Sequence, residues 1–248
     1  MNVIYILWIR QIKRFLRSKA RLIGSVGQPL LFLLAFGFGF GPVFQRAGQG
    51  NYIEFLAPGI IAMSVLFTAI FSGMEIIWDR QFGFLKETLV APVSRFKIMI
   101  GRTLGGATVA VLQGLIVLAI SFFAGFRITN FSLFPVALVF MVFIALLFTA
   151  FGTALASRMQ DAQGFQLIIN FLVMPIFFLS GAMFPLTGLP RVLTVITNLN
   201  PLAYGVDGLR GSLIANSIFG LWTDFGILAG VTIIFIILGS YLFSKIEI

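Results

Sequence analysis

Residues 128–157 read ITNFSLFPVALVFMVFIALLFTAFGTALAS and place 30 uncharged residues between Arg127 and Arg158. About 20 apolar residues in a helix, each rising 1.5 Å, cross the ~30 Å hydrocarbon core of a bilayer. Five further uncharged stretches of 20 to 29 residues occur in the chain. The sequence therefore predicts an all-α membrane protein. Its six expected transmembrane helices lie near residues 22–41, 55–77, 99–126, 133–157, 166–185 and 225–244.

Composition supports a membrane protein and restricts its chemistry. Of 248 residues, 59% are hydrophobic and 10% are charged, whereas a soluble domain has roughly a quarter charged residues. Soluble enzymes, nucleic-acid binders and disordered regulators are thereby disfavoured. The chain has no Cys and no His, which removes thiolate chemistry, the commonest metal ligand and the usual acid–base side chain. We expect no metal site, no catalytic residue, no cofactor bound by this chain and no nucleic-acid partner.

The positive charges predict which way the chain crosses the membrane. With the N-terminus inside, the cytoplasmic segments carry 13 Lys and Arg residues and the outer segments carry 4. Cytoplasmic loops are enriched in Lys and Arg. We therefore expect a multi-pass protein of the cell (inner) membrane with both termini in the cytoplasm.

Residues 1–21 carry six basic residues and predict an amphipathic helix at the cytoplasmic membrane surface. On a helix, Ile4, Trp8, Ile12 and Phe15 share one side, and basic residues gather on another. The bases would face anionic lipid; the helix could also contact a cytoplasmic partner. The candidate membrane-surface residues are Trp8, Arg10, Lys13, Arg14 and Arg17.

The cytoplasmic loop at residues 78–97 reads WDRQFGFLKETLVAPVSRFK. It predicts a short polar helix over Asp79–Leu89 that Pro92 ends, and Ser94 is a plausible N-cap for the next helix. A loop that only reversed the chain would need few residues. Docking onto a cytoplasmic partner and a solvated amphipathic loop both remain open.

Two stretches resemble a known family. FLKETLVAPVSRFKIMIGRTLGG (84–106) is similar to the signature loop of type-2 ABC transporter permeases, the half-size export subunits. FLSGAMFPLTGLPRVLTVITNLNPLAYGVDGLRGSL (178–213) is similar to the outer-face segment of the same family. The resemblance extends over nearly the whole chain and implies a single transmembrane domain over residues 1–248.

The resemblance implies that the loop holds a coupling helix seated in a groove of a separate ATPase subunit. The expected ATPase-coupling residues are Phe82, Gly83, Phe84, Leu85, Lys86, Glu87, Leu89, Ala91 and Pro92. The chain has no GxxxxGK[ST] motif, so ATP and Mg would bind to that partner. The family assembly has two permeases, here an expected homodimer, and two ATPase subunits. The basic arm resembles the connector helix beside this contact.

The segment at residues 186–223 predicts two short helices, Pro190–Thr197 and Pro201–Leu213. The resemblance implies that they re-enter the outer leaflet and cap the exit; an interfacial loop is the alternative. We expect Asp207 and Arg210 to pair within the second helix, and Glu75 to lie at the interface or pair with Arg80. The candidate outer-gate residues are Pro185, Pro190, Asn200, Pro201, Asp207 and Arg210.

These observations favour a membrane subunit that forms half of an export pathway for an amphiphilic or drug-like cargo. A polysaccharide or a lipid-linked glycan is the alternative cargo for the same architecture. An ion-coupled carrier or channel is the alternative of another class, disfavoured because the spans carry almost no ionisable groups in their middles. An intramembrane enzyme is disfavoured most.

Overall fold

The computed structural model describes residues 3–48, 50–90 and 92–246, and in those ranges it contains helices and no strands. The α-helices in chain order are α1 (Val3–Arg17), α2 (Lys19–Arg46), α3 (Tyr52–Ser72), α4 (Met74–Gln81), α5 (Phe84–Val90), α6 (Arg95–Phe123), α7 (Phe134–Ser157), α8 (Ala162–Phe178), α9 (Arg191–Leu199), α10 (Pro201–Ile214) and α11 (Leu221–Ser244). A single 3₁₀ turn, η1 (Phe131–Leu133), precedes α7.

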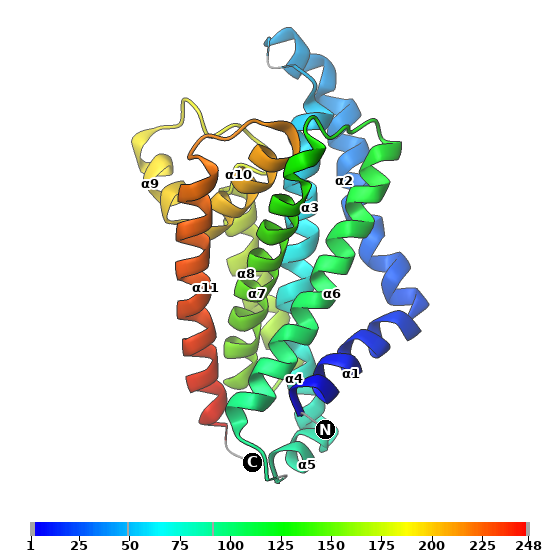
Figure 1. The fold of residues 1–248 in the computed structure, drawn as a ribbon, viewed down its shortest axis with the longest axis vertical. Helices are drawn as coiled ribbons and strands as arrows, with labels where there is room; N and C mark the ends of the chain where they lie inside the picture. Colours follow the sequence, from blue (N-terminus) through cyan, green and yellow to red (C-terminus); the bar gives the residue numbers. More distant parts are fainter. Residues whose placement is uncertain (1–2, 49, 91, 247–248) are drawn as a thin grey trace.

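The long helices run roughly parallel, with short helices at the two ends (Figure 1). At one end lie α1, α5 and the last turn of α11; α9 and α10 lie at the opposite end (Figure 1). Helices α3, α6 and α7 pack against one another, and α11 packs on α7. Helix α3 is the most enclosed of the long helices, whereas α2 and α11 leave most of their apolar surface uncovered.

Five of the six predicted spans are confirmed as helices long and apolar enough to cross a membrane: 24–46, 52–81, 95–123, 131–157 and 221–244. The fifth predicted span, 166–185, differs. Helix α8 starts earlier, at Ala162, and ends at Phe178, so it is apolar but only 17 residues long. Pro175 lies inside its last turn, and the chain then turns at Gly181, whose φ is +76°. A right-handed helix cannot continue through the left-handed backbone of Gly181.

Close packing in the core depends on glycines in neighbouring helices. Gly152 on α7 lies against α3, and a Cβ added there would come within 2.5 Å of the carbonyl oxygen of Ile70. Gly73, at the junction of α3 and α4, in turn faces the backbone of Gly152. Because neither residue has a side chain, the two backbones approach directly, as small residues permit at membrane helix interfaces.

The loop at residues 78–97, predicted to be cytoplasmic, differs from its prediction in where its helices begin. The second span continues as α4 as far as Gln81, so Asp79 belongs to the end of that span and not to a separate helix. Gly83 has a φ of +79° and changes the direction of the chain between the two helices. Glycine tolerates this left-handed backbone. The separate helix α5 then covers Phe84–Val90. Ser94 has an extended backbone before α6 but makes no side-chain cap hydrogen bond.

Candidate coupling site

Helix α1 is docked on the N-terminal half of α6. Leu7, Gln11 and Phe15 are its buried residues, and the indole Nε1 of Trp8 donates a hydrogen bond to Thr108 Oγ1 at 2.9 Å. The contact depends on small residues: a Cβ added at Gly105 would meet Gln11 at 2.6 Å. The predicted amphipathic helix is thus present, and it packs against protein along the Leu7–Gln11–Phe15 side.

Asp79 is the centre of a charge cluster made of Arg10, Arg14, Glu75, Asp79 and Arg102. Its side chain is 8% exposed and accepts from Arg102, which is 3% exposed. Arg10 donates to both carboxylate oxygens of Asp79, at 3.1 and 3.3 Å. One carboxylate therefore ties α1 and α6 to the end of α4. A buried ion of either sign is costly unless it is paired, so these contacts are mutually dependent.

Glu75 and Arg80 do not form the pair that the sequence suggested. Arg14 Nη1 lies 3.5 Å from Glu75 Oε2. Arg80 donates to the carbonyl oxygens of Met159 and Ser157, at 2.7 and 3.1 Å. Glu75 thus interacts with α1, and Arg80 fastens α4 to the turn between α7 and α8.

The expectation that the basic residues of α1 face lipid is wrong for Arg10 and Arg14 and stays a prediction for the exposed Lys13 and Arg17. Lys13 and Arg17 are exposed, but Arg10 and Arg14 turn towards the carboxylates of α4. Arg10 also lies over the ring of Phe84, 3.9 Å from its centroid, a cation–π contact. The charge cluster consequently reaches the first residue of α5.

Helix α5 exposes one face at the end of the bundle and buries the other. Phe82, just before it, is 84% exposed, and Lys86, Glu87 and Pro92 are exposed as well. Leu85 is 2% exposed, so its side chain lies inside this chain and is not available to a partner in this conformation. Gly83, Phe84 and Leu89 are half-buried, and Ala91 lies outside the described residues.

The outer end is organised by α10, whose residues from Leu202 to Leu213 are all buried. Asn200 caps this helix as predicted, accepting from Leu202 N at 3.0 Å, and its amide donates to the carbonyl oxygen of Ile176 on α8. Pro201 is half-buried at the first helical position, Pro185 is half-buried, and Pro190 is exposed before α9.

Asp207 and Arg210 do not pair with each other. Each binds to other groups. Asp207 accepts from Ser217 Oγ at 2.9 Å and from the amides of Ile218 and Phe219 at 2.8 and 2.9 Å. Arg210 donates to the Gly181 carbonyl at 2.9 Å. Burial lowers the pKa of Arg210 to about 10, and the nearby Asp207 opposes that shift; the guanidinium therefore stays charged at neutral pH.

Arg210 also stacks on the ring of Phe55, 3.9 Å from its centroid. Together with its bond to the Gly181 carbonyl, this contact joins α3 and the turn after α8 to the same buried side chain. The predicted pairing of Asp207 with Arg210 is thus wrong. Asp207 binds the loop before α11, and Arg210 binds α3 and the turn after α8.

Three ionisable residues have surroundings that the sequence did not predict. In the prediction, Arg102 only marked the boundary of a span. In the structure it lies in the third turn of α6, where a buried charge requires a counter-ion. Asp79 was assigned to a polar loop helix. Asp224 is fully buried in the first turn of α11, and its carboxylate has no hydrogen-bond partner among the described residues. An acidic residue is favoured in the first turn of a helix. This preference is the feature of the sequence that could have indicated the position of Asp224.

Comparison with known proteins identifies the architecture. Residues 2–214 match the family model described as ABC-2 type transporter. The chain is 31% identical to the transport permease ycf38 of Cyanophora paradoxa, over 94% of this chain and 85% of that protein. It is 29% identical to the inner membrane transport permease YadH of Escherichia coli K12, over 90% and 87%. It is 26% identical to nodulation protein J of Rhizobium leguminosarum bv. viciae, over 84% and 81%.

These matches span nearly all of the helices described above and agree with the resemblance found in residues 84–106 and 178–213. In ABC-2 systems the permease is not an enzyme, and ATP hydrolysis resides on a separate subunit. The predicted inner-membrane localisation is also confirmed, with several membrane spans. The chain belongs to the ABC-2 type transporter family, as its membrane-spanning permease component.

Proposed function

We propose that this permease forms half of the export pathway of an ATP-driven transporter built from two permease copies and two ATPase subunits. ATP and Mg would bind to the ATPase subunits. The observation that carries the proposal is the exposed face of α5: Phe82, Lys86 and Glu87 project from the end of the bundle. An aromatic anchor beside charges of both signs is the composition expected of a protein–protein contact.

The connections of α5 support a coupling role. Arg10 contacts both Phe84 and Asp79, and Asp79 in turn contacts Arg102 on α6. A displacement of α5 by an ATPase subunit would thus act on α1, α4 and α6 together. Because packed elements respond as discrete units, ATP-driven movement at this end would change the arrangement of the spans.

The proposed orientation places α1, α5 and the end of α11 in the cytoplasm, in agreement with the 13 Lys and Arg residues expected on that side. In this arrangement α8 is the fifth of six crossing segments in chain order, completed by the turn after Phe178. Helices α9 and α10 would then lie in the outer leaflet as re-entrant helices, with Asn200, Asp207 and Arg210 securing the outer end.

A second copy and an amphiphilic cargo complete the proposal. Helix α2 leaves most of its apolar surface uncovered, and Phe171 on α8 is 80% exposed. Apolar surface of this extent suits either lipid or a second permease, and the family assembly favours a homodimer about such helices. Amphiphiles, drug-like molecules and lipid-linked glycans all partition into the surrounding bilayer, and we favour an amphiphilic cargo.

The test is co-purification from native cells in mild detergent. The tagged chain is expected to bring down an ATPase subunit in a one-to-one ratio. Phe82→Ala and Glu87→Lys should abolish that association, whereas Phe123→Ala, which changes a 92% exposed side chain at the other end of α6, should not. A chain that arrives without an ATPase, with transport unaffected by ATP depletion, would point to an ion-coupled carrier or channel.

A further inference from the structure

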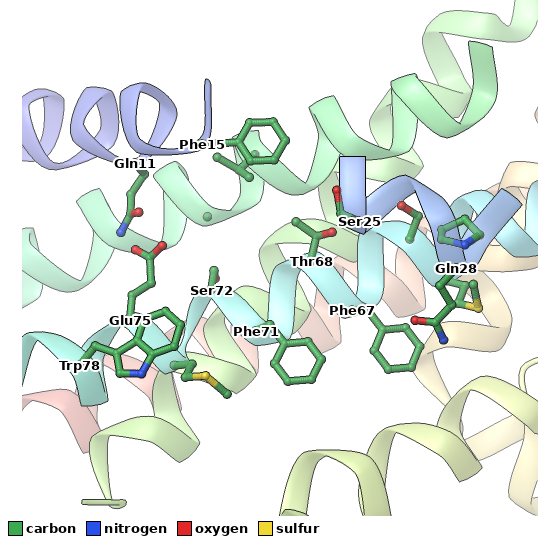
Figure 2. A pocket seen from close by; sticks show the side chains of 17 residues that line it. Gln11, Phe15, Ser25, Gln28, Phe67, Thr68, Phe71, Ser72, Glu75 and Trp78 are labelled. Carbon is green, nitrogen blue, oxygen red and sulfur yellow. The ribbon is translucent and has the colours of Figure 1, made fainter. Parts of the chain in front are cut away.

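A cavity of about 350 Å³ lies among α1, α2, α3, α4 and α6, in the half of the molecule nearest the charge cluster. Figure 2 shows it following α3, with Glu75 and Trp78 near one end and Gln28 near the other. From Glu75 to Ser64 the helical rise amounts to about 16 Å. The cavity is therefore elongated, and its volume lies within the range of ligand pockets.

The walls of the middle part are aromatic. Phe67 and Phe71 stack on each other with centroids 6.3 Å apart, and Phe15 of α1 lines the cavity from the other side (Figure 2). These rings offer an apolar body of a ligand a favourable surface. Deeper in the cavity, Ser64 is 3% exposed, and its hydroxyl has no hydrogen-bond partner among the described residues. A buried hydroxyl in this state favours a polar ligand atom or water.

The end near the charge cluster is lined by a carboxylate and an indole. Glu75 is 5% exposed and lines the cavity together with Trp78. Arg14 now supplies a positive charge there: its Nη1 lies 3.5 Å from Glu75 Oε2, and its guanidinium carbon lies 6.0 Å from the Trp78 ring centroid. A carboxylate beside an indole is a favourable setting for ammonium groups, which bind over the face of Trp.

We propose that this cavity binds a cationic amphiphile, with its positive headgroup at Glu75 and Trp78 and its apolar chain along Phe67 and Phe71. In the present structure the guanidinium of Arg14 occupies the headgroup position, and the ligand displaces it. The proposal rests on the export function proposed above, because it names the chemical class of the cargo. It also links cargo to coupling, since Arg14 belongs to the helix that contacts α5.

The two partners of the Arg14–Glu75 pair make opposite predictions. Glu75→Gln removes the group that binds the headgroup, so affinity for a cationic amphiphile should fall about tenfold or more. Arg14→Gln removes the cation of this pair, which competes with the headgroup, so affinity should rise by a factor of about 2–5. If the pair served only to hold α1 in place, both substitutions would change binding in the same direction. A misfolded variant cannot give tighter saturable binding, so the rise is diagnostic.

The experiment uses the full chain in lipid nanodiscs with Trp8→Phe and Trp222→Phe, which leaves Trp78 as the fluorescent reporter. The probe is a dodecyl-dimethylammonium amphiphile that carries a nitroxide quencher on its headgroup. A dodecyl phosphate with the same nitroxide is the anionic control. A chain that keeps Trp222, which is 89% exposed, in place of Trp78 measures quenching by probe dissolved in the lipid.

We expect saturable quenching of Trp78 by the cationic probe, only unsaturable quenching of Trp222, and the opposite shifts described for the two variants. Lys13→Gln, which removes an exposed cation of the same helix, should leave the affinity unchanged. Equal quenching by both probes, stronger binding of the anionic probe, or parallel changes in the two variants would overturn the proposal. Absence of binding together with an intact ATPase association would reject the cargo class alone, whereas loss of that association would reject the export function itself.

Discussion

Replacement of Asp79 by asparagine should strongly destabilise the permease, since Asp79 is the shared counter-ion of two arginines. The substitution keeps the size of the side chain but leaves Arg102 as a buried, unpaired charge, with Nε and Nη1 already lacking hydrogen-bond partners among the described residues. Removing one partner of a buried pair costs about 3–5 kcal/mol. The Arg10 pair adds less, about 0.2–1 kcal/mol, because Arg10 is 31% exposed and solvent screens it.

A loss of this size lowers the melting temperature by about 6–20 °C for a chain of this length. Thermal unfolding of the purified protein in detergent, followed by far-ultraviolet circular dichroism, measures the shift. Glu87→Gln, which neutralises an exposed carboxylate, is the matched control and should change stability by no more than about 0.5 kcal/mol.

The double variant Asp79→Asn, Arg102→Met tests the cause. Removing the orphaned charge should recover most of the lost stability, since an apolar side chain can replace a buried ion at little cost. Equal stability of Asp79→Asn and the unmodified protein, or no recovery in the double variant, would refute the view that Arg102 is a buried charge held by Asp79.

Three further outcomes are expected. Gly152→Ala should cost about 1–3 kcal/mol by overpacking against the Ile70 carbonyl, measured by thermal unfolding, whereas Gly39→Ala, with open space around it, should not destabilise. Asp207→Asn weakens the hydrogen bonds to the loop before α11, so proteolysis in that loop should become several times faster if it samples an open state. Gly83→Ala has space for its methyl group but a φ of +79°, so the free energy of unfolding should fall by about 1–2 kcal/mol from backbone strain alone. No change in the free energy of unfolding would mean that the turn relaxes freely.

The helical architecture was readable from the sequence because charges in a membrane protein mark where spans end. The long uncharged run before Arg158 became α7, and Asn200 capped α10 as its residue type predicts. The early end of α8 was not predicted, because hydropathy continues past Phe178 while the positive φ of Gly181 prevents the helix from continuing.

The charge cluster was not predictable in the same way. Arg10, Asp79 and Arg102 are far apart in the sequence, and only the packing of three helices brings them together. Periodicity placed Arg10 on a face of α1 that could equally meet lipid or protein. The exposed face of α5, by contrast, could be predicted directly, because Lys86 and Glu87 are charged residues in a short loop helix.

The docking of α1 also has a consequence for biosynthesis. Trp8 and its hydrogen-bond partner Thr108 are 100 residues apart, and the chain grows at about 5–20 residues per second. The basic arm therefore leaves the ribosome about 5–20 s before its seat on α6 has been synthesised. Asp79 lies 69 residues after Arg10, so for about the first two thirds of that interval this carboxylate does not yet exist, and Arg10 is free to attach to anionic lipid. In the proposed orientation the arm would then serve first as a topogenic signal and only later as a structural element of the finished bundle.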